Sequence, residues 1–362
     1  MRRVVYLLGA GAMIDFDGPK TCELTGICAD ILKKHHCESI LSSLDATYGK
    51  GNYNFETIIA SIEFLMDWAV AHERQGYISV DNTNVIVSIM CSKYQSFNSD
   101  QLLLIYKELI NCIIERLSKY DYNFSHKPEH NVLKCLFKNV FEKKIIKIYS
   151  LNYDRLIPHL FGNSINDGTM CSSDFFSYNL KQFINYKQSY FNLHGSIYLK
   201  KEIDQTVLSY KVRQCGIPQS LTYVLEQEGG SPNDRKIFSP IIAGYSKSQR
   251  MLGEPFNFGL GVFMEDCSLC DELIIVGYSF SDPHINSIIR NYSKFGNIDI
   301  IIVDKKDVSI IKQDLTSKFH VVHPFREDNG SSYNRDDKIR IYTNGFLDYM
   351  NIHLKGVCKQ WI

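Results

Sequence analysis

The chain has 362 residues, of which 40 are basic and 40 acidic, so its formal net charge is zero. This balance argues against a globally basic surface, and we expect no direct binding to nucleic acid and none to an anionic membrane. No apolar run approaches the roughly 20 residues that cross a bilayer. We also expect no secretory signal, because the apolar run after Arg2 and Arg3 is too short and ends in glycine.

The chain contains 11 cysteines, an odd number scattered through apolar segments. In a chain of this size the pattern is typical of reduced thiols in a cytoplasmic protein. Cys267 and Cys270 form the one C-x-x-C pair, within a segment that reads as a helix. Structural zinc sites need four ligands and no second pair is present, so we expect no metal.

The first predicted element is a buried strand over residues 4–8, which is apolar and partly β-branched. It ends in Gly9-Ala10-Gly11-Ala12. The two glycines would let the backbone turn tightly and approach a diphosphate, whose charge would be met by amide N–H groups at the start of the next helix. A dinucleotide dehydrogenase would have a third glycine where this chain has Ile14, so the motif alone is weak.

Helical periodicity dominates the next part of the chain. We predict a helix over residues 22–34, then a helical subdomain over residues 40–144 whose apolar positions line single helix faces at 55–70, 102–117 and 129–142. The simplest interpretation of these side chains is packing, and they offer no evident chemistry.

From residue 145 the pattern changes to short, apolar, β-branched strands of the buried parallel type. We predict such strands at residues 145–150, 190–193, 237–242, 273–276 and 298–303, and a last strand and helix over about 338–353. Polar or glycine residues follow each strand. Ligands of an open parallel sheet bind beyond the carboxyl ends of its strands, so these ends are the expected site.

Three polar residues follow predicted strands in positions that suit chemistry. Asn152 and Asp154 stand in the segment Ser150-Leu-Asn-Tyr-Asp, and His194 is followed by Gly195. Asparagine and aspartate at such places often only cap a helix or make an Asx turn. A histidine has a pKa near neutrality and suits a general base, although a structural hydrogen-bonding role is the commoner one.

A second glycine turn follows the strand at 273–276. Gly277, Tyr278 and Ser279 could offer backbone donors and a hydroxyl to ribose or phosphate, whereas the simpler interpretation is a helix start capped by Ser281 or Asp282. Asp304 ends the strand at 298–303. It could accept hydrogen bonds from an adenosine ribose, or it could be an ordinary loop carboxylate.

In the order in which they occur, these motifs resemble the sirtuin superfamily, and within it the bacterial sirtuin-like proteins of antiphage defence. The resemblance covers residues 4–20 and about 145–305, and the helical insertion adds to the likeness. It implies an α/β fold with a Rossmann-like doubly wound parallel sheet. The domain bounds would be 1–39 and 145–362 for the NAD-binding domain and 40–144 for the inserted helices.

The resemblance also implies roles for single residues. The first glycine turn (Gly9, Ala10, Gly11, Ala12) would bind the NAD diphosphate, Asn152 and Asp154 would lie near the nicotinamide ribose, and His194 would be the catalytic base. Gly277, Tyr278 and Ser279 match the turn that holds the adenosine side, with tyrosine in place of threonine. The sequence leaves open whether Asp15 or Asp17 faces the nicotinamide.

Departures from the family narrow the expected activity. The second C-x-x-C pair, the acyl-lysine-binding loop and the arginine of the first motif are all missing here. These differences count against deacylation of lysine and favour an NAD glycohydrolase that uses NAD as its substrate. The alternatives are a sirtuin-type deacylase or ADP-ribosyltransferase, and a non-catalytic module that senses NAD or ADP-ribose.

The resemblance further implies how such an enzyme is controlled. We expect no room for a separate sensor domain after the nucleotide-binding fold, and therefore control by a large homo-oligomer or by a partner. The most similar defence systems are the short forms paired with a HerA-type ATPase or translocase. The sequence has no G-x-x-x-x-G-K-S/T motif, so an ATPase would be supplied by that partner.

Overall fold

A computed structural model of the chain describes residues 1–75, 98–121, 128–167, 183, 185–204, 209–220, 222–225, 235–245, 247–293, 296–328 and 331–354. Among these residues, no helix is both long and apolar enough to cross a membrane.

The centre of the molecule is an eight-stranded sheet with the order β10-β11-β12-β9-β8-β1-β2-β3. Six neighbouring strands are parallel: β1 (Arg3–Leu8), β2 (Ile145–Ser150), β3 (Gln188–Asn192), β8 (Glu272–Val276), β9 (Asp299–Val303) and β12 (Ile339–Tyr342). β10 (Arg326–Asp328) and β11 (Ser331–Asn334) extend one edge in antiparallel pairing.

The strand order explains where a ligand would bind. From β1 the chain proceeds outward to β2 and β3, and then returns to the other side of β1 to form β8, β9 and β12. The order β3-β2-β1-β8-β9-β12 is that of a Rossmann-type sheet, with its topological switch point between β1 and β8. The predicted fold class, a doubly wound and mainly parallel α/β sheet, is therefore confirmed.

Both faces of the sheet are covered by helices, which is why its strands are apolar on both sides. One face packs against α10 (Phe256–Leu269), α11 (Pro283–Tyr292) and α12 (Val308–Phe319). The other packs against the 3-10 helix η1 (Ala10–Phe16), α6 (Pro128–Lys143), α7 (Leu156–Phe161) and α13 (Phe346–Leu354). In β1 the side chains alternate, so Val5 and Leu7 face the first layer and Val4 and Tyr6 face the second.

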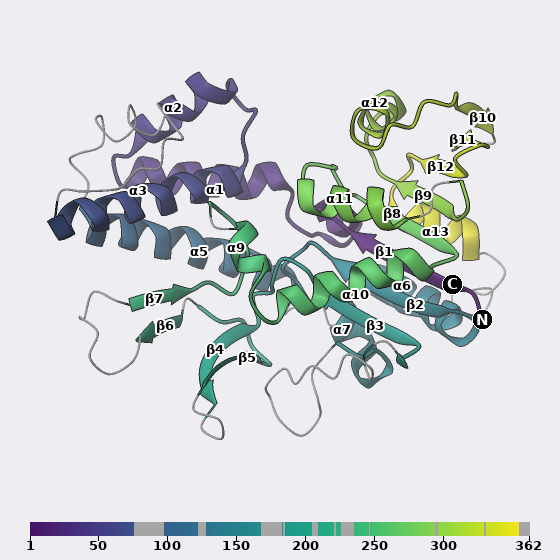
Figure 1. Cartoon of the computed structure of the whole chain (residues 1–362), viewed down its shortest axis with the longest axis horizontal. Coiled ribbons are helices and arrows are strands. Elements are labelled where there is room, and N and C mark those ends of the chain that lie inside the picture. Colours follow the sequence, from purple (N-terminus) through teal and green to yellow (C-terminus); the bar gives the residue numbers. More distant parts are fainter. Residues whose placement is uncertain are drawn as a thin grey trace.

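A third hydrophobic core belongs to a separate group of helices beside the carboxyl ends of the strands (Figure 1). We name it the helical cluster: α1 (Thr21–Lys34), α2 (Glu38–Tyr48), α3 (Phe55–Gln75) and α5 (Ser99–Asp121). Loop residues Tyr153, Ile197 and Ile241 from the sheet side pack into the same core. The cluster therefore shares buried surface with the strand-end loops.

This packing divides the chain differently from the predicted bounds of 40–144. The helical cluster begins with α1, whereas α6 packs on the sheet together with α13 and α7. Parts of the predicted insertion, residues 76–97 and 122–127, lie outside the described residues.

The prediction of a parallel strand at residues 237–242 is wrong. β7 (Arg235–Phe238) pairs antiparallel with β6 (Thr222–Leu225), in a two-stranded sheet apart from the main one. A second hairpin, β4 (Leu199–Asp204) with β5 (Ser209–Gln214), lies after β3. Residues 239–243 instead run as a buried loop, in which Ile241 bridges Gly195 and reaches the helical cluster. The short helices η2 (Gly162–Ser164) and α9 (Lys247–Met251) complete the fold.

Candidate functional site

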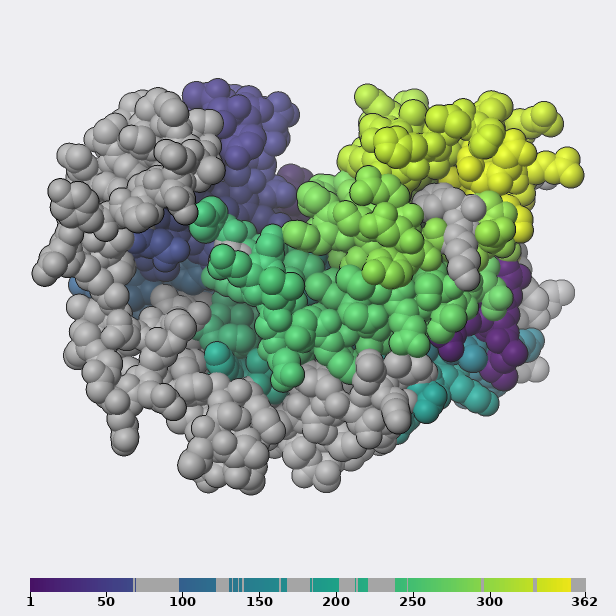
Figure 2. Space-filling model, viewed as in Figure 1, coloured from purple at the N-terminus to yellow at the C-terminus, as the bar shows by residue number. Residues whose placement is uncertain are grey.

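A cavity of about 490 Å³ lies at the carboxyl ends of β1, β2, β8 and β9. This volume falls within the range of about 300–1,000 Å³ that is usual for small-molecule sites. The helical cluster forms its opposite wall through α1, the start of α3 and Leu117 of α5. Figure 2 shows the surface hollowed between the helical cluster and the part of the molecule that follows β9. The cavity therefore lies at the switch point of the sheet.

The turns after β1 and β8 pack backbone against backbone beneath this cavity. The amide of Gly9 donates to the carbonyl of Val276 at 2.8 Å, and the amide of Gly11 donates to the carbonyl of Gly277 at 2.9 Å. A Cβ atom on Gly11 would lie 2.7 Å from Gly277 Cα, and one on Gly277 would lie 2.2 Å from Ala12 N. Gly277 also has a positive φ of 58°. The glycines are thus required by the contact between the two turns.

This contact changes the predicted role of the first turn. The amides of Gly9, Gly11 and Ala12 all donate within the protein, the last to the carbonyl of Gly9 at 3.0 Å. Ala12 is buried and does not line the cavity, whereas Ala10 is exposed in it. Of these four amides, the N–H of Ala10 is therefore the one left for a bound diphosphate.

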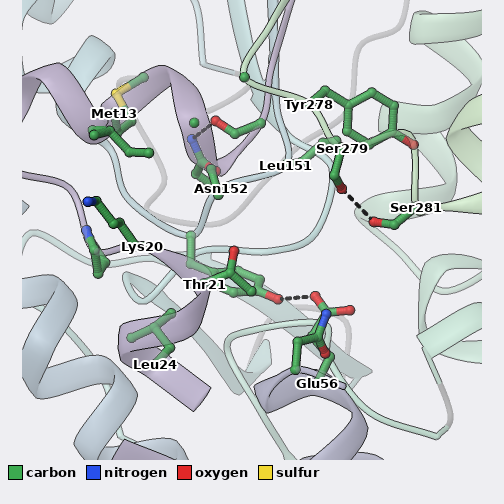
Figure 3. Close-up of a pocket in the computed structure, with 18 of the residues that line it drawn as sticks. Met13, Lys20, Thr21, Leu24, Glu56, Leu151, Asn152, Tyr278, Ser279 and Ser281 are labelled. Atoms are coloured by element: carbon green, nitrogen blue, oxygen red, sulfur yellow. Dashed lines mark hydrogen bonds between the residues drawn. The ribbon is translucent and has the colours of Figure 1, made fainter. Parts of the chain in front are cut away.

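Asn152 lies between the first turn and the cavity (Figure 3). Its side-chain Nδ2 donates to the backbone carbonyl of Gly9 at 3.0 Å. The backbone carbonyl of Asn152 accepts from Asn192 Nδ2 at 2.9 Å. The amide nitrogen is therefore occupied in holding the turn. Oδ1 remains as the atom of this side chain that can accept a hydrogen bond from a ligand.

His194 lines the same cavity, although only 4% of the residue is exposed. Its Nε2 lies 3.1 Å from Asp282 Oδ2, but the two groups are not aligned as a hydrogen bond, so the contact is electrostatic. Burial lowers the pKa of His194 below its ordinary value, Lys247 lowers it further, and Asp282 and Glu56 oppose this. A lowered pKa keeps the imidazole neutral near pH 7, as a general base requires.

Gly195, which follows His194, leaves room for a close approach of the protein's own backbone. It has a φ of +83°, and a Cβ atom there would lie 2.4 Å from the carbonyl oxygen of Pro240. The loop at Pro240 is held by the amide of Ile242, which donates to the carbonyl of His194 at 2.7 Å. This packing fixes the backbone on which His194 stands.

Asp154 borders the cavity but is 2% exposed. Its Oδ1 accepts from the amide of Leu156 at 3.1 Å, an Asx turn at the start of α7. Burial, together with the fully buried carboxylate of Asp121, raises the pKa of Asp154 to about 7. In its described contacts, the Asp154 side chain therefore stabilises the start of α7.

The second glycine turn has fewer groups available for a ligand than its sequence suggested. The hydroxyl oxygen of Tyr278 lies 3.0 Å from the carbonyl oxygen of Asp282 and 2.9 Å from Asn286 Oδ1, so its one proton is donated within the turn, and it accepts from the amide of Asp282 at 3.2 Å. Ser279 and Ser281 line the cavity with their hydroxyls 2.7 Å apart (Figure 3). Asp282 caps α11, as the simpler interpretation predicted, by accepting from the amides of His284 and Ile285.

Asp304 and Asp15 have different positions. Asp304 lines the cavity at the end of β9 and accepts from the amides of Lys305 and Lys306 at 2.7 and 3.2 Å. Asp15 does not line it. Its carboxylate pairs with Lys305 and accepts from the amide of Leu347, so it ties η1 to the loop after β9 and to α13.

Three charged residues of the site were missed as ligand-facing or catalytic candidates: Glu56, Lys247 and Asp282. Lys247 Nζ lies 3.1 Å from Glu56 Oε2 and 3.0 Å from Asp282 Oδ2. The sequence contained a signal only for Asp282, as a helix cap before proline. Glu56 and Lys247 lie in segments 191 positions apart, and only the fold brings them together.

Four lysines line the cavity: Lys20, Lys247, Lys305 and Lys306. Lys247 and Lys305 pair with carboxylates, whereas within the described ranges neither Lys20 nor Lys306 has a carboxylate within 4 Å. In the same ranges no group of three histidine, cysteine or acidic side chains could hold a metal ion. Cys267 and Cys270 are buried in the core on one face of the sheet.

The class of protein that the fold defines is a Rossmann-type α/β protein with an added helical cluster and a cavity at the switch point. No protein-family model matches the sequence, and no curated protein is similar to it at the sequence level.

Among solved structures, the chain is similar to a Sir2 homolog in complex with NAD, with 11% identity, coverage of 99% of this chain and 90% of that chain, and a TM-score of 0.44. It is also similar to Sir2 solved with a p53 peptide and NAD+ (11% identity, 98% and 93% coverage, TM-score 0.40). The fold assignment rests on the strand order of this chain itself.

Proposed function

We propose that this protein is an NAD glycohydrolase that converts NAD+ and water into nicotinamide, ADP-ribose and a proton. The observation that supports this most directly is the convergence of His194 and Asn152 with both glycine turns on one cavity at the switch point. Each of these groups follows a different strand, and NAD cleavage needs a dinucleotide site and a base at the same place.

The reaction breaks the bond between the nicotinamide nitrogen and the ribose C1′ carbon. Nicotinamide leaves with the bonding electron pair, and the oxygen of water forms the new bond to C1′. His194 would accept the proton that water loses, because its imidazole is held neutral by burial and by Lys247. Asn152 would orient the water or a ribose hydroxyl through Oδ1, since its Nδ2 is bonded to Gly9.

The rest of the dinucleotide would lie along the cavity toward β9. The diphosphate would meet the N–H of Ala10 and the charges of Lys20 and Lys306. The adenosine ribose would meet Ser279 or Asp304, whose carboxylate is fixed by two backbone amides. Together these residues supply donors for the anionic centre and acceptors for the sugar hydroxyls.

The proposed biological role follows from the sequence resemblance: depletion of NAD in the cytoplasm during bacterial antiphage defence. Unrestrained cleavage would exhaust the host's own NAD, so activity would depend on a large homo-oligomer or on a HerA-type ATPase partner. Mass measurement of the isolated chain, and of the chain expressed with its neighbouring gene product, tests this. A strict monomer in both preparations would contradict it.

The activity is tested by chromatography of NAD products, with and without the neighbouring gene product. We expect nicotinamide and ADP-ribose from the native chain. A general base contributes about 10²–10⁴-fold, so His194→Ala should lose most turnover and keep measurable NAD binding. His323→Ala is the matched control, because this histidine is half exposed and pairs with Asp337 away from the cavity.

Each other outcome points to a different function. Undiminished turnover in His194→Ala would contradict the role given to the imidazole. Formation of O-acetyl-ADP-ribose from an acetylated peptide would indicate a deacylase, and transfer of label from NAD to protein would indicate an ADP-ribosyltransferase. Tight binding without release of nicotinamide under every condition would indicate a sensor.

A further inference from the structure

A line of alternating charges crosses the cavity wall and ends at His194. Glu56 in the first turn of α3 is followed by Lys247 at the start of α9 and then by Asp282, the cap of α11. The nitrogen of Lys247 lies 3.1 Å from Glu56 Oε2 and 3.0 Å from Asp282 Oδ2. The same Asp282 oxygen lies 3.1 Å from His194 Nε2.

These groups are shielded enough from water for their charges to matter. The side chains of Asp282 and His194 are 6% and 5% exposed, and those of Lys247 and Glu56 are 19% and 27% exposed. Charges a few ångströms apart interact several-fold more strongly at such depth than in water. The far end of the line is fixed as well, because Tyr153 donates its hydroxyl to Glu56 Oε1 at 2.9 Å.

Glu56 and Asp282, the two carboxylates that Lys247 contacts, belong to different parts of the fold. Glu56 is part of the helical cluster, whereas Asp282 follows β8 and caps a helix that packs on the sheet. Lys247 therefore spans the boundary between the helical cluster and the sheet. Figure 3 shows Glu56 below Ser279 and Ser281 of the β8 turn in this view.

We propose that Glu56, Lys247 and Asp282 are positioning residues that set the orientation and the protonation state of His194, and that they couple the helical cluster to the base. The carboxylate of Asp282 lies 3.1 Å from Nε2 and its negative charge favours a proton on that nitrogen, so Nδ1 would be the nitrogen that takes a proton from a ligand. Lys247, held by Glu56, neutralises part of the Asp282 charge. The inference rests on the proposed function, in which His194 is the base.

The sign of each effect can be stated. Within the part of the chain that the structure describes, the titratable and charged groups around His194 are Asp282, Lys247, Glu56 and, beyond them, Tyr153. Asp282 and Glu56 raise the pKa of His194 and Lys247 lowers it. A base must be deprotonated, so the acid limb of the kcat/KM profile follows this pKa. Removal of Lys247 should move the limb to higher pH, and removal of Glu56 should move it to lower pH.

The first experiment measures the charge effect directly in the full chain. The ring Cε1–H resonance of His194, assigned by its loss in His194→Gln, is titrated by NMR in the native protein, Lys247→Met and Glu56→Gln. We expect opposite shifts of the midpoint in the two variants. Lys247→Arg should restore the native midpoint, and Lys312→Met, which removes an exposed ion pair with Glu327, should leave it unchanged.

The second experiment uses NAD turnover. Asparagine is about as good a helix N-cap as aspartate. Asp282→Asn should therefore keep α11 folded but remove the negative charge that we propose orients the imidazole of His194. We expect kcat to fall about 10²-fold or more with little change in KM, by analogy with general-base losses of about 10²–10⁴-fold. The pH profiles of Lys247→Met and Glu56→Gln should shift in opposite directions, as their midpoints do.

The two hypotheses fail in different ways. Shifts in the same direction, or no shift in either variant, would overturn the positioning role even if the native enzyme cleaves NAD. Opposite NMR shifts in a protein that never releases nicotinamide would support the charge coupling and overturn the proposed hydrolysis.

Discussion

At the scale of single residues, Asp154 should make stability depend on pH. Its pKa in the folded protein is raised to about 7 by burial and by Asp121, whereas an unfolded aspartate titrates near pH 3.9. Between these values the folded chain holds a proton that the unfolded chain has released. The free energy of unfolding should therefore fall as pH rises from about 4 to about 7.

Asp154→Asn tests this, since an amide keeps the acceptor for the Leu156 N–H but cannot ionise. The free energy of unfolding of the variant minus that of the native protein should be larger at pH 8 than at pH 5, by an amount on the order of a few kcal/mol. Urea unfolding at both pH values measures it. Asp30→Asn, an exposed carboxylate paired with Lys33, should show no such gain, and an equal difference at both pH values would contradict the assignment.

At the scale of elements, the contact between the two glycine turns should be intolerant of any side chain. Gly11→Ala would place a Cβ atom 2.7 Å from Gly277 Cα, and a backbone atom cannot turn aside. Overpacking of this kind costs about 1–3 kcal/mol. We expect a loss of thermal stability together with weaker NAD binding.

Gly261→Ala provides the matched control, because this exposed glycine lies inside α10 with nothing within 4 Å of an added Cβ. Alanine there should be neutral or stabilising by up to about 1 kcal/mol. Calorimetric melting of the two variants decides the matter. If Gly11→Ala melted like the native chain, the turns would not pack as described.

Some helices and strands could be predicted from the sequence and others could not. Strands buried on both faces and long amphipathic helices have local signals, and β1, β2, β8, β9, α3 and α5 were predicted close to their bounds. The segment at residues 237–242 has an equally apolar pattern, but its first part pairs in a hairpin and its second part, around Ile241, packs into the helical cluster. The apolar composition of a segment predicts that it is buried, but it does not predict which strand the segment pairs with.

The site divides in a similar way. Asn152, His194, Gly277 and Asp304 could be located because strand ends carry sequence signals, and all four line the cavity. The occupied amides of the first turn, and the meeting of Glu56 with Lys247, depend on contacts between segments far apart in the chain. Such contacts leave no local pattern in a single sequence.

At the scale of the whole molecule, the cavity is walled by two bodies with separate hydrophobic cores. Thr21 and Phe55 line it from the helical cluster, whereas Gly277 and Ser281 line it from the sheet. A ligand that fills it would contact both bodies and disfavour openings that separate them. Bound ligand should therefore slow amide exchange on both sides of the cavity.

Hydrogen–deuterium exchange with ADP-ribose, in large excess over its Kd, measures this. We expect slower exchange at the starts of α1 and α3 and in the turns after β1 and β8. α12 is the internal reference, because no residue of this helix lines the cavity and its exchange should not change. Protection confined to the two turns would mean that the ligand does not reach the helical cluster, which would remove the physical basis for coupling that cluster to His194.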